Sequence, residues 1–93
     1  MLLKSSIQAA ADMEGYLAKL TTALKSTAAA QKMLDWSKDF AARTPFAVDE
    51  VVDASVRLEM YGLGARKWLP LVGDLAGAMG KRVTDAVEAI ADA

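Results

Sequence analysis

The sequence predicts an all-α protein, a small bundle of four to five short helices. Apolar residues recur at spacings of three and four along most of the chain, as expected for helices with one buried face. Much of the 54% hydrophobic fraction is alanine, the strongest helix former. Proline and glycine then divide the chain into short segments. We expect a single helical domain over 1–93, with helices at 3–25, 27–43, 47–61, 67–79 and 83–92.

The first helix carries an apolar seam with alternating steps of four and three residues. Its positions are Leu3, Ile7, Ala10, Leu17 and Leu24, and Glu14 and Thr21 fill the two remaining slots. Leu20 and Met13 widen this apolar stripe. An amphipathic helix that packs on its neighbours explains this pattern, and a self-associating coiled-coil seam is the sharper alternative.

The second helix begins after Ser26, a favourable N-cap residue. We expect a break near Lys25–Ser26; without it, helices one and two would form one longer N-terminal helix. The predicted buried face consists of Ala30, Met33, Leu34, Ser37, Phe40 and Ala41.

A sharp corner separates the second and third helices. Thr44-Pro45 ends the second helix, because proline disfavours helical geometry in the residue before it and lacks an N–H, and Phe46 is placed to pack over the corner. In the third helix, Asp49 and Glu50 suit the positive end of the helix dipole. Its expected apolar face consists of Val52, Val56 and Met60. The helix is expected to end at Gly62 and Gly64.

The fourth helix contains Pro70, which we expect in its first turn, where a missing N–H costs nothing. Gly73 and Gly77, four residues apart, predict close approach of another helix. Gly80 is the expected C-cap, and Thr84 the expected cap of the fifth helix. The predicted apolar faces are Leu69, Val72, Ala76 and Met79 in the fourth helix and Val83, Val87, Ile90 and Ala91 in the fifth.

Composition excludes several classes of function. A net charge of −1 argues against binding nucleic acid through phosphate neutralisation. The chain has no cysteine and no histidine, which removes disulfides, the usual zinc ligands and the commonest general base. The N-terminus lacks the long apolar core of a secretory signal, and the most apolar run, Trp68–Gly80, is too short to span a bilayer.

No catalytic, cofactor-binding or metal site emerges, so we expect a protein that is not an enzyme. Ser5, Ser6, Ser26, Ser37 and Ser55 have no histidine to activate them, and adjacent Ser37 and Lys38 point apart on a helix. The carboxylates of Asp49, Glu50 and Asp53 favour a solvated helix start over a metal or acid–base site. Gly62-x-Gly64 lacks the remainder of a dinucleotide loop. Arg66-Lys67 and Lys81-Arg82 favour a solvated face over a phosphate contact.

Several linked segments resemble the core of tail tape measure proteins of tailed bacteriophages. They are ARTPF, the VVDA…YGL helix, WLPLVGDLAGAMGK and AVEAIADA, and the likeness covers roughly residues 14–93. Asp49 departs from it, since a proline is common there. Such proteins are many hundreds of residues long, so the chain is expected to be a fragment.

The resemblance implies a structural and assembly function. A tape measure protein sets tail length and scaffolds the tail tube, lies in the tube lumen of the virion, and is in the host cytoplasm during assembly. The implied partners are the tail tube protein, tail assembly chaperones and further copies of the chain. Because short packed helices make a poor ruler, the measuring stretch is expected elsewhere in the parent chain.

Two alternatives belong to other classes. A small secreted helical-hairpin protein that binds a partner suits the length and alanine content, but its W-x-G turn is missing after both Trp36 and Trp68. An amphipathic coat protein of lipid or polymer granules would need one continuous exposed apolar face, which the prolines and glycines interrupt.

Overall fold

The computed structural model describes residues 2–92, with side chains from Gln8 onward. Within these residues the chain forms five helices and no strand: α1 (Leu2–Leu24), α2 (Thr27–Ala42), α3 (Val48–Met60), α4 (Ala65–Met79) and α5 (Val83–Asp92). The predicted all-α bundle of short helices is confirmed. The side chains of Leu3, Ser5, Ser6 and Ile7 lie outside the described residues.

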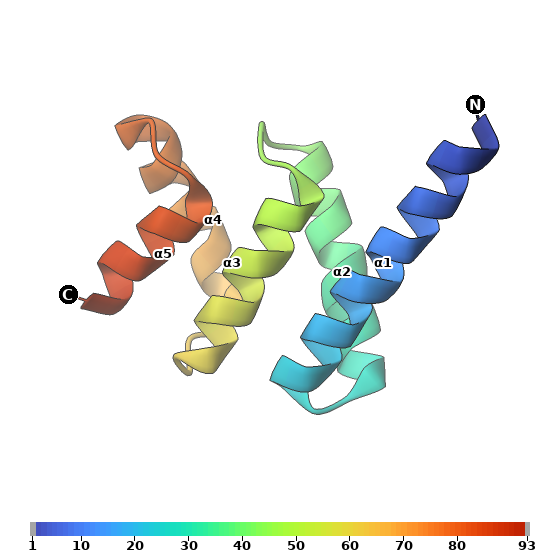
Figure 1. Cartoon of the computed structure of the whole chain (residues 1–93). Coiled ribbons are helices and arrows are strands. Elements are labelled where there is room, and N and C mark those ends of the chain that lie inside the picture. The colour runs from blue at the N-terminus through green and yellow to red at the C-terminus, as the bar shows by residue number, and fades with distance from the viewer. Residues whose placement is uncertain (1, 93) are drawn as a thin grey trace.

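Helix α3 is the centre of the arrangement, because it packs against each of the other four helices. The hairpin of α1 and α2 lies on one side of it and the hairpin of α4 and α5 on the other (Figure 1). The molecule is flat as a result, with principal extents of 44 × 30 × 18 Å.

Local signals in the sequence end the helices. Lys25 adopts a positive φ of 59°, and the Ser26 hydroxyl then accepts a hydrogen bond from the Ala29 N–H at 3.1 Å, which caps α2. Gly62 follows α3 with φ 78°, and Gly80 follows α4 with φ 66°. Both glycines sit in the left-handed region that commonly closes helices.

One continuous core runs through the five helices. The buried face of α2 is the predicted one. Its members are Ala30, Met33, Leu34, Ser37, Phe40 and Ala41, and they pack with Leu20 of α1 and with the buried residues of α3, α4 and α5.

The predicted faces of α1 and α3 were partly wrong. In α1, Leu20 is fully buried as expected, whereas Ala10 of the expected seam is exposed. In α3, the buried face centres on Val51, Val52 and Leu58, and Met60 is 75% exposed. Steps of four residues advance about 40° around a helix each time, so a line drawn through them leaves the core within two turns.

The predicted start of the fourth helix and the predicted cap of the fifth also differ from the structure. Helix α4 begins at Ala65, so Pro70 lies inside the helix beyond the first turn, on an exposed side. Thr84 does not cap α5, because the helix begins one residue earlier, at Val83. The Val83 N–H donates instead to the Glu50 carboxylate of α3 at 2.9 Å.

Candidate functional site

A groove between α2 and α4 is one of the concave surfaces of the described residues. It encloses about 340 Å³ and is open to solvent. The corner after α2 and one side of α4 line it: Phe40, Thr44, Pro45, Phe46, Pro70, Gly73, Asp74, Gly77 and Ala78. Asp74 is its one charged lining residue, so the surface offered to a ligand is mainly apolar. Helices α2 and α4 both lie behind α3 in Figure 1.

The floor of this groove exists because Gly73 has no side chain. A Cβ at position 73 would lie 3.2 Å from Cε2 of Phe46 and 3.4 Å from Cζ of Phe40. The Phe40 ring is itself held by Trp36, with the two rings stacked at a centroid distance of 5.1 Å. The corner predicted at Thr44-Pro45 thus places Phe46 over α4 and brings α2 and α4 together.

Gly77 has a different environment, although it lies only one turn further along α4. A Cβ added there would meet nothing within 4 Å. The two glycines were predicted to share one close helix contact, and only Gly73 makes it. Gly77 instead leaves the backbone of α4 exposed at the groove, where a ligand can approach it closely.

Exposed apolar side chains extend along α4 beside the groove. Leu71 is 59% exposed, Leu75 37% and Met79 52%. Met79 was predicted to be buried, but it is the last residue of the helix and lies beyond the core. Single exposed apolar residues are ordinary on protein surfaces, whereas a row beside an apolar cavity is a feature of binding surfaces.

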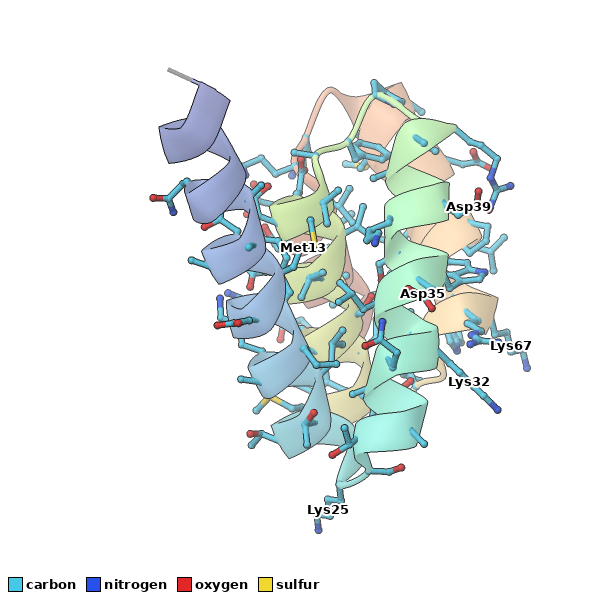
Figure 2. All side chains as sticks on the ribbon, turned by 90° about the vertical axis from the view of Figure 1, so that its right-hand side faces the viewer. Met13, Lys25, Lys32, Asp35, Asp39 and Lys67 are labelled. Atoms are coloured by element: carbon cyan, nitrogen blue, oxygen red, sulfur yellow. The ribbon has the colours of Figure 1, made fainter. Side chains whose placement is uncertain are left out.

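Two basic side chains and one carboxylate lie at the other end of α2 and α4. A second cavity of about 330 Å³ there is lined by Lys32 of α2 and by Arg66 of α4, together with Met33 and Glu59. Lys32 and Lys67 project on the same side of the molecule in Figure 2. Because the first turns of both helices meet at this end and their last turns meet at the groove, α2 and α4 run parallel.

A polar cluster connects α3 with α5 on another side of the bundle. Glu88 accepts hydrogen bonds from Arg57 Nη1 at 2.6 Å and from the Tyr61 hydroxyl at 2.8 Å. These two bonds lower the pKa of the Glu88 carboxyl below its usual value, and the bond to Glu88 raises the pKa of the Tyr61 hydroxyl. The cluster holds two helices together and is exposed, so we assign it a structural role.

The acidic cluster singled out in the sequence is separated by the fold. Glu50 caps α5, Asp53 pairs with Lys19 of α1 at 3.6 Å, and Asp49 accepts the N–H of Glu50. Among the described residues, no group of three carboxylate, histidine or cysteine side chains is placed to hold a metal ion. These carboxylates therefore bind helix ends and neighbouring helices.

The serines with described side chains have structural surroundings. Ser26 caps α2, and the buried Ser55 donates to the Val51 carbonyl at 2.8 Å. Ser37 is fully buried, and its hydroxyl has no hydrogen-bond partner among the described residues. The basic residues Arg66, Lys67, Lys81 and Arg82 are all exposed. No helix in residues 2–92 combines the length and the hydropathy that crossing a bilayer requires.

Comparisons with known proteins gave one significant similarity among curated sequences. The chain is 42% identical to the Chaperone protein DnaK of Deinococcus proteolyticus over 60 residues, which cover 57% of this chain and 10% of that protein. The chain therefore corresponds to about a tenth of the length of that chaperone. No family model matches the chain, and no solved structure matches it significantly.

This similarity overturns the resemblance to phage tail tape measure proteins, because it links the chain to a chaperone and not to a tail component. The role in setting tail length, the tail tube and tail assembly partners, and the phage and virion assignments were wrong. The structure gives the physical reason. The segments ARTPF and WLPLVGDLAGAMG form a corner and a close helix contact, which any compact helical bundle can use. The predicted location in a tail tube and in host cytoplasm rested on the same resemblance and stays untested.

The secreted-hairpin alternative does not describe this fold. That class consists of two helices, whereas residues 2–92 form five helices around α3.

Proposed function

We propose that this chain is a polypeptide-binding module of chaperone type, which holds a short amphipathic helix of another protein in the groove between α2 and α4. It acts by binding and not by catalysis. The observation that carries the proposal is the open apolar groove of about 340 Å³ with Asp74 as its one charged lining residue. Grooves of this kind accept the apolar face of a helix, with side chains anchored one turn apart.

Charges at the two ends of α2 and α4 indicate the chemistry of a ligand that extends from the groove along both helices. Lys32 and Arg66 lie at the end where α2 and α4 begin, and Asp74 lies towards the end where they finish. The parallel dipoles of α2 and α4 add positive potential at the first end and negative potential at the second. A helix that binds antiparallel to α2 and α4 is therefore favoured, with acidic residues in its last turn and a basic residue in its first turn.

The similarity to a chaperone supports this class of ligand. A chaperone acts on other polypeptides, and non-native polypeptides expose apolar segments that native proteins bury. The open backbone at Gly77 allows a bound helix to approach α4 closely, and the neighbouring Leu71 and Leu75 extend the apolar contact. Self-association of the chain, also expected from the sequence, is a separate proposal.

A designed peptide tests the proposal directly. The probe is a fluorescent peptide of about 16 residues, the length of α4, with leucines at every fourth position, glutamates in its last turn and lysines in its first. We expect saturable binding in a fluorescence anisotropy titration. A peptide with the same leucines and the charges exchanged between its ends should bind at least about tenfold more weakly, because like charges would then meet at both ends.

Two glycine variants locate the binding site. Gly77→Leu fills open space at the groove, and Gly15→Leu adds the same side chain at an equally open position of α1, away from the groove. We expect Gly77→Leu to weaken peptide binding at least about tenfold and Gly15→Leu to leave it unchanged. Equal binding by Gly77→Leu and the unmodified chain would place the ligand elsewhere, and no binding by either would refute the proposed function.

A further inference from the structure

The outer face of α4 carries a pattern that is complementary to itself. Lys67, Leu71, Asp74, Leu75 and Ala78 fall on one side of the helix and are exposed. Leu71 lies between the two charged residues, which are seven positions apart, or about 10 Å along the helix. Neither charge forms an ion pair with another described residue, although both stand next to exposed apolar side chains.

We propose that this face binds a second copy of the same chain, with the two α4 helices packed antiparallel about a two-fold axis near Pro70 and Leu71. Such an axis brings Lys67 of each copy to Asp74 of the other, so the interface contains two equivalent ion pairs. It places the Leu71 side chains of the two copies against each other and covers Leu75. A two-fold interface requires a self-complementary patch of this kind.

The charge pattern selects this orientation over the parallel one. In a parallel pair of α4 helices in register, Lys67 would face Lys67 and Asp74 would face Asp74, and like charges placed opposite each other weaken association. About this axis, residues 65–76 of the two α4 helices overlap, which gives a contact about 18 Å long and suits a small interface in rapid exchange.

Charge exchange tests the proposal without disturbing the monomer. The residues three and four positions away from Lys67 and Asp74 on α4 are all uncharged, so reversing either charge changes no ion pair within the helix. Each of Lys67→Glu and Asp74→Lys should weaken the dimer at least about tenfold in sedimentation equilibrium. The double variant restores both pairs with opposite polarity and should recover the original affinity.

Lys38→Glu is the matched control, because Lys38 is equally exposed but lies on α2. It should leave the dimer unchanged. A monomer at every concentration up to about 1 mM, the weakest affinity that we would count as specific, would overturn the proposal. So would a double variant that associates no better than the single variants.

A crosslinking experiment tests the position of the axis. The chain contains no cysteine, so single-cysteine variants report one position each. Leu71→Cys places the two thiols beside the axis, within the range where a disulfide forms, whereas Lys81→Cys places them far apart. We expect mild oxidation to link Leu71→Cys into a covalent dimer and to leave Lys81→Cys monomeric. Equal crosslinking of the two variants would show that the contact is not the one proposed.

The dimer face shares Asp74 and Ala78 with the groove, so a second copy and a bound peptide compete for α4. Peptide binding is therefore measured at concentrations where the chain is monomeric. Peptide binding by a chain that stays monomeric would support the proposed function and refute this inference. A dimer that the single charge variants weaken and the double variant restores, in a chain that binds no peptide, would support this inference and refute the proposed function.

Discussion

Gly73 and Gly77 of α4 show how strongly a single residue's surroundings decide its role. We predict that Gly77→Ala raises the free energy of unfolding by about 0.5–1 kcal/mol, because alanine favours helix and its methyl group meets nothing. Gly73→Ala gains the same propensity but forces the Phe46 and Phe40 rings away from a Cβ only 3.2 and 3.4 Å distant. Its free energy of unfolding should therefore be at least about 1 kcal/mol lower than that of Gly77→Ala. Urea denaturation of the two variants measures this difference, and equal stability would show that the rings move freely.

Glu88 makes stability depend on acid pH. Hydrogen bonds from Tyr61 and Arg57 hold its pKa in the folded state below the unfolded value of about 4.5. Its contribution to stability is therefore complete above that value and is lost as the pH falls through the lower, folded pKa. We predict that the unmodified chain loses more stability than Glu88→Gln when the pH is lowered from 6 to 3. Parallel thermal melts across that range test the prediction, and identical pH profiles for the two proteins would contradict it.

At the scale of the helix, α3 determines where the two following helices begin. The Glu59 carboxylate accepts the Ala65 N–H at 3.0 Å at the start of α4, and the Glu50 carboxylate accepts the Val83 N–H at 2.9 Å at the start of α5. Gly64, the N-cap residue of α4, has no side chain to do this. Two glutamates of one helix thus replace local caps, and a carboxylate there also suits the helix dipole.

We predict that Glu50→Ala and Glu59→Ala each lower the free energy of unfolding by about 1 kcal/mol. Each variant should locally affect a different helix. Hydrogen exchange should accelerate at the first amides of α5 in Glu50→Ala and at those of α4 in Glu59→Ala. Ser26→Ala is the matched control for a local cap, and it should affect only the first turn of α2. Equal acceleration over all helices in any of these variants would mean that the cap acts on the whole fold.

The same helices show which features of the fold can be predicted from the sequence. The face of α2 and the glycine ends of α3 and α4 were predictable, because they depend on residues a few positions apart. The caps from Glu50 and Glu59 were not, since each joins a carboxylate to a helix start that only the tertiary fold brings near. The groove could be predicted only in part from the sequence. The Thr44-Pro45 corner and the glycine pair pointed to it, but the opposite environments of Gly73 and Gly77 depend on where Phe46 falls.

At the scale of the whole molecule, α3 joins two hairpins that share few other contacts (Figure 1). Phe40 and Phe46 against Gly73 form the main bridge between α2 and α4. Val51, Val52 and Leu58 of α3 are each fully buried within the one continuous core. A hairpin without α3 would expose that core, so neither hairpin is expected to fold alone.

We therefore predict that the two hairpins unfold together. The chain carries two tryptophans, Trp36 on α2 and Trp68 on α4, and each is half-buried against the core. Trp68→Phe leaves a fluorescence probe in the first hairpin, and Trp36→Phe leaves one in the second. Each variant should show the same urea midpoint by fluorescence as by circular dichroism, as expected for a two-state transition. Leu58→Ala opens a cavity in the core around the central helix and should lower the free energy of unfolding by about 2–5 kcal/mol. Both midpoints should fall by the same amount. A fluorescence midpoint that departs from the circular dichroism midpoint in one variant only would show that its hairpin folds independently, and α3 would then be a linker between two units and not their common core.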